Sequence, residues 1–480
     1  MSAILQPKWC YMKQNYNFSA FIPIVLGIYL VTMANGAGYL AVILVALPAL
    51  LLISGGIRSL LKPDYWAPHH VVCGALLALL LALPVGFLCS ASLGYSMLAI
   101  AVVCFITGGW IQIRMHPRFD DIPAPKPTPI YSAQVALDDA VLSLMSSFAA
   151  VPNRSLLAEA VRESETAYAL FKEYGWLDNP RAFHKQPPAI ERVNSTPLRI
   201  RGFDCEHLAI ESQFVPSQEI PGNDRWQSYA ANQTSHAYIL RHQKPGPWLI
   251  CVHGAGMGHP KQDFKAFRVA QLHQRGINVA LFTLPVHGAR APGKINGEKF
   301  FGVSVLDFVH GMSHAIWDLR RLISWIRHQQ STQIGAYGIS LGAYTSALLA
   351  GIEENLDCVI AGVPTSDLIH TNEYLASALQ HRLGIAAGIN MTQDRAIHRV
   401  VSPLCVDPFP ARQNRYMYAA SADQFVPIEQ VRALWLHWEK PEIQWLTGGH
   451  VLAPFQRNVH QFVESATARS FGLFPAPAGE

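Results

Sequence analysis

Two long stretches of the sequence contain no charged side chain. Residues 18–57 and 71–113 contain no Asp, Glu, Lys or Arg, although 15% of the whole chain is charged. Each stretch is long enough for two helices of about 20 residues across a bilayer. The alternative, a buried helical core in a soluble protein, is disfavoured because it would need two large uncharged blocks. We therefore predict about four transmembrane helices within residues 18–115, at 18–34, 38–57, 71–89 and 94–113.

Patterns for metals, disulfides and nucleic acids are also missing. The eight cysteines form no C-x-x-C pair, and no histidine and cysteine cluster has the spacing of metal ligands. We expect no disulfide framework, no metal and no cofactor. The net charge of +4 is modest, and no basic patch with interleaved aromatic residues is present. The sequence therefore gives no reason to expect a nucleic-acid partner.

Basic residues flank the predicted spans unevenly. They precede the first span, separate the second from the third and follow the fourth: Lys8, Lys13, Arg58, Lys62, Arg114, Arg118 and Lys126. The other two turns carry no charge. By the positive-inside rule both termini face the cytoplasm. We therefore predict a multi-pass protein of the inner or plasma membrane, with a cytoplasmic N-terminal segment at 1–17 and the rest of the chain on the same side.

A proline-rich linker at 116–130 follows the membrane region. Five prolines make it a stiff, extended spacer: Pro117, Pro123, Pro125, Pro127 and Pro129. Residues 131–199 form a predicted helical connector, with amphipathic helices at 131–149 and 154–175. We expect these helices to pack on the following domain rather than on the membrane surface, and we interpret 471–480 as a tail.

The C-terminal half contains a motif for a nucleophile. Gly338-Ile339-Ser340-Leu341-Gly342 follows a short apolar run and precedes a helix-like stretch of small residues. A serine on a sharp strand-to-helix turn exposes its hydroxyl, and glycines two positions before and after leave room for the cramped backbone. The pentapeptide alone is also compatible with an ordinary turn. Ser340 is nevertheless the best candidate nucleophile in the chain.

The surrounding sequence supplies the other groups that a serine nucleophile needs. A strand-like run ends in the glycine-rich turn 253–258, whose backbone N–H groups can face an oxyanion. Asp423 follows a second strand-like run, and His450 follows a third, just before the last amphipathic helix. A histidine can take the serine proton, and a carboxylate can orient the imidazole.

Short apolar runs alternate with helical stretches through this region. They are typical of buried parallel strands and begin near Glu206, Ala237, Trp248, Asn278, Gln333, Leu356, Arg415 and Glu442. We therefore predict a mostly parallel sheet with flanking helices. A helical stretch at about 365–403 interrupts the alternation, and its position suggests a cap insertion.

From about residue 200 to 470 the chain resembles the α/β-hydrolase superfamily, whose triad follows the order serine, acid, histidine. The resemblance implies an α/β-hydrolase fold with Ser340 as nucleophile, His450 as general base and acid, and Asp423 as the orienting carboxylate. It also implies that the N–H groups of Ala255 and Leu341 form the oxyanion hole.

In some members of this superfamily the acid follows the preceding strand, where this chain has Asp367. We prefer Asp423, because its loop leads into Val426-Pro427 and a helix. Strand-end residues are candidates for the pocket: His253, Gly254, Gly256, His287 and Arg290. Arg290 either binds an acidic substrate group or is a solvated loop arginine.

Together these patterns predict a membrane-anchored serine hydrolase that cleaves a small-molecule or lipid-like ester through an acyl-enzyme. An acyltransferase or a peptidase with the same triad is an alternative. A second alternative is a non-catalytic membrane scaffold or binding module. The absence of ionisable residues within the spans argues against an ion or proton pathway. The sequence gives no basis for an oligomeric state.

Overall fold

The computed structural model describes residues 17–61, 66–148, 152–190, 193, 195–329, 331–376 and 378–473. The predictions for residues 1–16, for Lys62 and for the tail from residue 474 lie outside these ranges. The chain divides into two compact units. Unit 1 comprises residues 1–150, 420–428 and 445–453, and unit 2 comprises residues 151–419, 429–444 and 454–480. Two short loops of the predicted hydrolase domain thus group with the apolar N-terminal helices.

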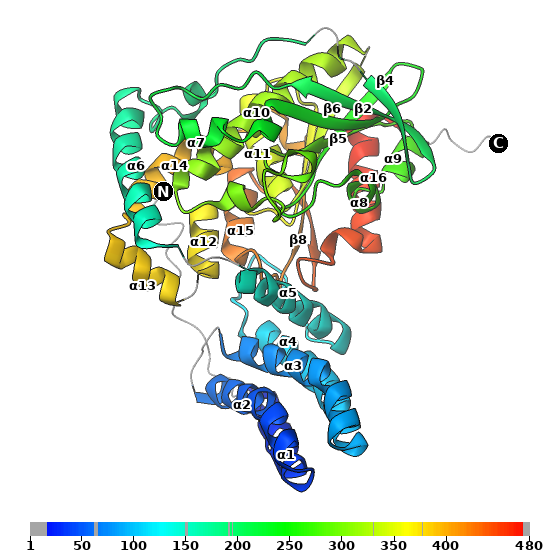
Figure 1. Cartoon of the computed structure of the whole chain (residues 1–480). Coiled ribbons are helices and arrows are strands. Elements are labelled where there is room, and N and C mark those ends of the chain that lie inside the picture. The colour runs from blue at the N-terminus through cyan, green and yellow to red at the C-terminus, as the bar shows by residue number, and fades with distance from the viewer. Residues whose placement is uncertain are drawn as a thin grey trace, which may run out of the picture. The chain divides into compact units, whose positions relative to one another are not determined.

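Unit 1 contains four helices long and apolar enough to cross a membrane within the described residues (Figure 1). They are α1 (Phe21–Gly36, extended by a short turn from Phe18), α2 (Tyr39–Leu61), α3 (Ala67–Leu88) and α4 (Ala91–Met115). Each helix packs on the next in the chain, and α1 also packs on α4. Their shared core consists of aliphatic side chains with Met97 and Cys104, and it has no charged member. The helices coincide with the four predicted spans to within four residues at each end.

Helix α5 (Pro129–Phe148) follows α4 and packs on it. The intervening residues 116–128 form no regular helix or strand, as expected of a proline-rich segment. A small apolar cluster of Ile113, Val135 and Ala422 joins the end of α4, helix α5 and the loop before Asp423. The first of the two predicted connector helices therefore belongs to unit 1.

The sheet has nine strands within the described residues, in the order β1-β2-β3-β5-β4-β6-β7-β8-β9. Their bounds are β1 Ser195–Ile200, β2 Phe203–Glu211, β3 Thr234–Leu240, β4 Gly246–Val252, β5 Asn278–Thr283, β6 Ser331–Ile339, β7 Cys358–Gly362, β8 Arg415–Ala420 and β9 Glu442–Leu446. The pairs β1–β2, β2–β3 and β3–β5 are antiparallel. The pairs β5–β4, β4–β6, β6–β7 and β7–β8 are parallel. This mostly parallel sheet confirms the predicted fold class. Strand β1 was not predicted, and it begins five residues before the expected domain boundary.

Helices cover the parallel strands because these strands are buried along almost their whole length. Helix α11 (Leu341–Ile352) packs on β6, β7 and β4, and α10 (Val305–His328) packs on β6 and α11. Helix α9 (Val269–Gln274) packs on β5, and α16 (Arg457–Phe471) packs on β7. The remaining helices named below are α7 (Asn223–Gln227), α8 (Pro260–Ala266) and α15 (Ile428–His437).

Three helices occupy the predicted cap insertion between β7 and β8. They are α12 (Leu368–Leu375), α13 (Ala378–Ala387) and α14 (Met391–His398). Helix α6 (Arg154–Glu173), the second predicted connector helix, packs on α13 and α14. It is further held by the ion pair of Glu163 with Arg225 on α7 at 2.6 Å. Helix α6 therefore packs on unit 2, as expected, and the role of the insertion as a cap stays a prediction.

Candidate active site

Ser340 occupies the tight turn between β6 and α11. Its backbone has φ +56° and ψ −116°, a conformation that residues with side chains rarely adopt. Such strain costs about 1–3 kcal/mol and persists only where the surroundings enforce it. Here the Ser340 N–H donates to the Gly362 carbonyl at 2.8 Å, and the Tyr344 N–H donates to the Ser340 carbonyl at 3.0 Å. The turn is therefore fixed by the neighbouring strand β7 and by the first turn of α11.

The two glycines of the motif are required by space. A Cβ atom at Gly338 would lie 1.9 Å from the Gly342 carbonyl oxygen. A Cβ atom at Gly342 would lie 1.9 Å from the carbonyl oxygen of Val252, at the end of the neighbouring strand β4. No side chain fits at either position without moving the backbone. The segment therefore has the strained serine and the crowded glycines that a nucleophile elbow needs.

The glycine-rich turn after β4 lies beside this elbow. A Cβ atom at Gly254 would lie 3.4 Å from the Ser340 Cβ and 3.3 Å from the Ile339 carbonyl oxygen. Ala255 is exposed at the tip of the turn. Leu341 is the first residue of α11, where backbone N–H groups have no acceptor within the helix. Both predicted oxyanion donors thus lie on segments next to Ser340, and their role stays a prediction.

Two side chains that the sequence reasoning missed hold the glycine-rich turn. The Asn296 amide donates to the carbonyls of Gly256 and Met257 at 2.7 and 2.6 Å, and its oxygen accepts from the Gly288 N–H at 2.7 Å. Asp263, on α8, accepts from the Gly258 N–H at 3.4 Å. No motif marks either residue, because their partners are backbone atoms of other loops.

His253 and His287 are buried structural groups. His253 accepts from the Leu284 N–H through Nε2 at 3.0 Å, so its Nδ1 carries the proton and donates to the Gly254 carbonyl at 2.8 Å. Burial lowers the pKa of His253 to about 3 and that of His287 to about 4. The two rings meet edge to face, with centroids 5.1 Å apart. Both histidines brace the strand-end loops as neutral rings, and their place at the pocket stays a prediction.

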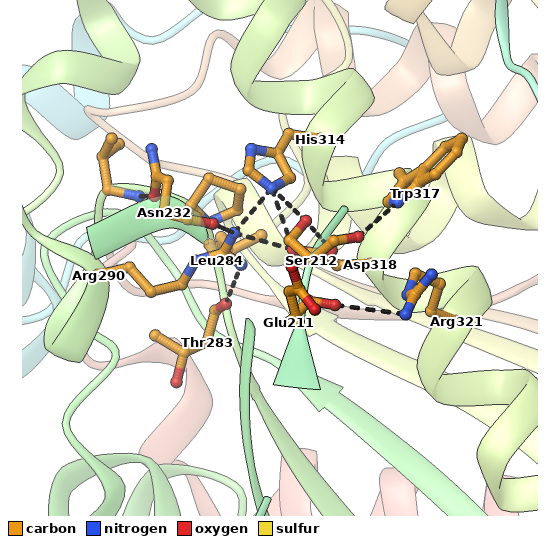
Figure 2. Close-up of polar contacts among 12 residues, drawn as sticks. Glu211, Ser212, Asn232, Thr283, Leu284, Arg290, His314, Trp317, Asp318 and Arg321 are labelled. Atoms are coloured by element: carbon orange, nitrogen blue, oxygen red, sulfur yellow. Dashed lines mark hydrogen bonds and ion pairs between the residues drawn. The ribbon is translucent and has the colours of Figure 1, made fainter. Parts of the chain in front are cut away.

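Arg290 differs from both of its predicted roles. Its side chain is fully buried, and a guanidinium nitrogen lies 2.8 Å from Asp318 Oδ2 and 3.0 Å from His314 Nε2 (Figure 2). The Ser212 hydroxyl lies 2.6 Å from Asp318 Oδ1 and 2.7 Å from His314 Nε2. Burial opposes the charge on Asp318, but Arg290 and His314 hold its pKa down to about 2. Arg290 is therefore neither solvated nor open to a substrate, because it neutralises a carboxylate in the core.

Asp423 and His450 form a buried pair in unit 1. His450 Nδ1 lies 2.6 Å from Asp423 Oδ2, and the Phe425 ring stacks on the imidazole. Asp423 Oδ1 accepts the N–H groups of Phe425 and Val426 at 2.8 and 2.9 Å. This arrangement places the imidazole proton on Nδ1 and makes Nε2 the basic nitrogen of the neutral ring. The predicted acid and the predicted base are thus brought together.

Charges around His450 favour its protonated form. Burial opposes protonation, but the Asp423 carboxylate, and behind it Asp138, raise the pKa of His450 above its ordinary value. Asp138 lies on α5 and accepts backbone N–H groups of the His450 loop. The sequence reasoning missed Asp138, which looks like an ordinary acid on an amphipathic helix.

The alternative acid, Asp367, has a different role. It caps the N-terminus of α12, where its carboxylate accepts the His370 N–H at 3.0 Å. Its own N–H donates to Gln430 on α15 at 3.0 Å. The contact of His450 with Asp423 favours Asp423 as the triad acid. Ser340 belongs to unit 2 and the acid–base pair to unit 1, so the assembled triad stays a prediction.

Comparisons with known proteins identify relatives over most of the chain. Two Mycobacterium tuberculosis proteins, described as uncharacterized protein Rv2627c (strain H37Rv) and uncharacterized protein MT2702 (strain CDC 1551), are each 39% identical over 363 residues. The matches cover 75% of this chain and 86% of each relative. No family model matches the chain.

Similar solved structures include two bacterial esterases. Acetyl xylan esterase 1 from Thermoanaerobacterium is 15% identical, with a TM-score of 0.44 over 64% of this chain and 94% of that structure. The acetyl xylan esterase from Paenibacillus is 16% identical, with a TM-score of 0.43, and the match covers 61% of this chain and 93% of that structure. These low values support no inference about substrate, so the fold assignment rests on the sheet order and the Ser340 turn. The chain belongs to the family of the two Mycobacterium tuberculosis proteins, and it has the α/β-hydrolase fold preceded by four apolar helices.

Proposed function

We propose that this protein is a membrane-anchored serine hydrolase that cleaves a carboxylic ester. The observation that carries the proposal is the strained backbone of Ser340, held between two glycines that admit no side chain. Proteins retain such strain where it serves a site, and a serine on a strand-to-helix turn of this kind exposes its hydroxyl. The buried pair of Asp423 and His450 supplies the acid–base chemistry that a serine hydroxyl needs at neutral pH.

In the proposed reaction the Ser340 hydroxyl attacks the ester carbonyl while His450 Nε2 takes its proton. The N–H groups of Ala255 and Leu341 stabilise the oxyanion, where one donor typically contributes 10²–10³-fold in rate. His450 then gives the proton to the leaving alcohol, and an acyl-enzyme on Ser340 remains. Water, deprotonated by His450, attacks this ester and releases the acid. Asp423 holds the imidazole in one tautomer throughout.

A lipid-like ester is the substrate class we favour, because the apolar helices and the loops of Asp423 and His450 belong to one compact unit. Arg58 lies in the last turn of α2 and Arg114 in the last turn of α4. When all four helices span the bilayer, the second and the fourth end on the same side of it. The positive-inside rule then assigns the hydrolase domain to the cytoplasmic face.

Labelling of the full-length protein in detergent with a fluorophosphonate tests the proposal. We expect wild type to label, Ser340→Ala to lose labelling completely and His450→Ala to label far more slowly, since removal of either residue costs about 10⁶-fold in a related triad. Ser346→Ala is the matched control, because Ser346 is a buried serine on the same helix α11. Absence of labelling in folded wild type would favour a non-catalytic binding module. Product analysis with an added alcohol or amine separates hydrolysis from acyl transfer.

A further inference from the structure

Asp138 is a fully buried carboxylate on α5, and its partners are two loops that lie far away in the sequence. Its Oδ2 accepts the His450 N–H at 2.5 Å and the Gln424 N–H at 3.4 Å. Its Oδ1 accepts the Val451 N–H at 2.9 Å. All of these residues belong to unit 1. One carboxylate therefore joins the loop of the candidate base to the loop of the candidate acid.

A carboxylate is well suited to this position because its two oxygens accept hydrogen bonds and donate none when ionised. An amide in its place would present an NH₂ group to at least one of the backbone donors. The fit is also tight, since a Cβ atom at Gly449 would lie 2.5 Å from Asp138 Oδ2. The loop geometry thus depends on an acid at 138 and on glycine at 449.

We propose that Asp138 is a positioning residue for the His450–Asp423 pair, and that this one side chain joins the helix after the membrane region to the loops of the candidate acid and base. The inference rests on the proposed hydrolase function. Asp138 holds the backbone N–H of His450, and so fixes the position from which the imidazole extends. It also holds the backbone N–H of Gln424, the residue after Asp423. The two side chains then meet at 2.6 Å.

The membrane helices are connected to these loops through α5. A Cβ atom at Gly109 on α4 would lie 1.9 Å from the Ser132 carbonyl oxygen and 3.0 Å from the Ala136 nitrogen, both on α5. Such close approach fixes α5 on the last apolar helix. Val135 on α5 also contacts Ile113 at the end of α4 and Ala422 beside Asp423. Helix α5 therefore contacts both the last apolar helix and the loop before Asp423.

The charge of Asp138 also acts on His450. Burial, and then the Asp423 charge, raise the pKa of Asp138, while His450 and the backbone donors oppose this rise. The charged or titratable groups around the pair are Asp138, Asp423, His450 and His116, whose pKa burial lowers to about 4. Since an anion at 138 favours protonated His450, its removal lowers the pKa of His450. The acid limb of the pH–rate profile then moves to lower pH.

The test compares full-length wild type and Asp138→Asn in detergent, using p-nitrophenyl butyrate hydrolysis and fluorophosphonate labelling between pH 5 and 9. We expect kcat/KM of Asp138→Asn to fall by about tenfold to a hundredfold, the range expected when a reacting group is misplaced. The fall should lie in kcat rather than KM, with the acid limb at lower pH. Asp139→Asn is the matched control, because Asp139 is the adjacent acid on α5 but pairs with His69 at 2.7 Å. It should keep the wild-type rate and acid limb.

A folded Asp138→Asn with the wild-type rate and pH profile would overturn the inference while leaving the hydrolase function intact. If wild type itself neither turns over nor labels, the proposed function fails instead. If Asp138→Asn does not fold, Gly449→Ala tests the inference instead. This variant keeps the charge of Asp138, but its added Cβ displaces the carboxylate. We expect it to lower kcat at least tenfold with the acid limb in place, and wild-type activity there would also overturn the inference.

Discussion

The two halves of the candidate site are held by different physical means. The turn around Ser340 is fixed by sterics, since backbone atoms lie where Cβ atoms at Gly338 and Gly342 would be. The pair of Asp423 and His450 is fixed by charge and by hydrogen bonds from loop backbone to buried carboxylates. The steric half is local, within one strand–turn–helix segment. The charged half joins positions as far apart as Asp138 and His450, which are separated by 312 residues.

The difference explains how each half can fail. Steric strain is relieved only by moving the backbone, so a change at the elbow costs stability and activity together. An amide at Asp423 has the same shape and can keep its oxygen on the Phe425 and Val426 N–H groups, so a change there can remove catalysis and leave the fold. Substitutions in the two halves should therefore separate activity from stability.

Of the two candidate acids, Asp423 should have the larger effect on activity when it is changed to asparagine. An amide at this position still accepts the Phe425 and Val426 N–H groups but favours the wrong imidazole tautomer, which costs about 10⁴-fold in kcat in a comparable triad. Asp367→Asn is the control, since asparagine caps a helix nearly as well as aspartate. We expect it to keep kcat and the melting temperature. The measurement is p-nitrophenyl butyrate turnover by both variants. Slower turnover by Asp367→Asn than by Asp423→Asn would contradict the assignment of Asp423 as the acid.

The core also contains a buried charge pair, Arg290 with Asp318, and breaking this pair should affect stability most. Arg290→Met leaves the Asp318 carboxylate buried without its partner, which typically costs about 3–5 kcal/mol. Arg469→Met removes an exposed pair with Glu442 on side chains that are 42% and 50% exposed, and about 1 kcal/mol or less is expected. Thermal unfolding in detergent measures both. Equal shifts for the two variants would show that the buried pair is not held by charge.

The steric half is tested by Gly342→Ala. The added Cβ meets the Val252 carbonyl oxygen, and overpacking of this kind costs roughly 3 kcal/mol. Loss of fluorophosphonate labelling should accompany the lower melting temperature. At Gly293 a Cβ atom would meet nothing within 4 Å, so Gly293→Ala serves as the control with no expected loss. An active, stable Gly342→Ala would mean that the elbow is not sterically constrained.

The sequence predicted those features whose signal is local. Eight strands were recognised, most of them because they are apolar runs, whereas β1 is an exposed edge strand without such a run. The four apolar helices follow from the absence of charge. Ser340 could be found from five residues, and Asp423 and His450 from their chain order.

Features that depend on distant partners were missed or misjudged. Arg290 reads as a loop arginine because Asp318, its buried partner, lies on α10 beyond a long loop. Asn296 and Asp138 bind backbone atoms, which leave no trace in side-chain patterns. The grouping of the Asp423 and His450 loops with the N-terminal helices likewise depends on contacts across most of the chain.

Asp263 allows the sharpest comparison between the halves, because it resembles Asp138: a buried carboxylate that accepts a loop N–H, here that of Gly258. Burial raises the pKa of Asp263 to about 7. Folded protein therefore holds this proton where unfolded chain has lost it, and the stability it contributes falls as pH rises from about 4 to 7. Asp263→Asn removes this dependence. Its free energy of unfolding relative to wild type should therefore rise between pH 5 and pH 8, by an amount on the order of 1 kcal/mol. Asp204→Asn, at a side chain that is 94% exposed, should show no such trend. The acid limb of the pH–rate profile completes the comparison. If Asp263→Asn kept the wild-type acid limb while Asp138→Asn moved it, charge would control activity only through the His450 half, and the Ser340 half would be held by steric fit.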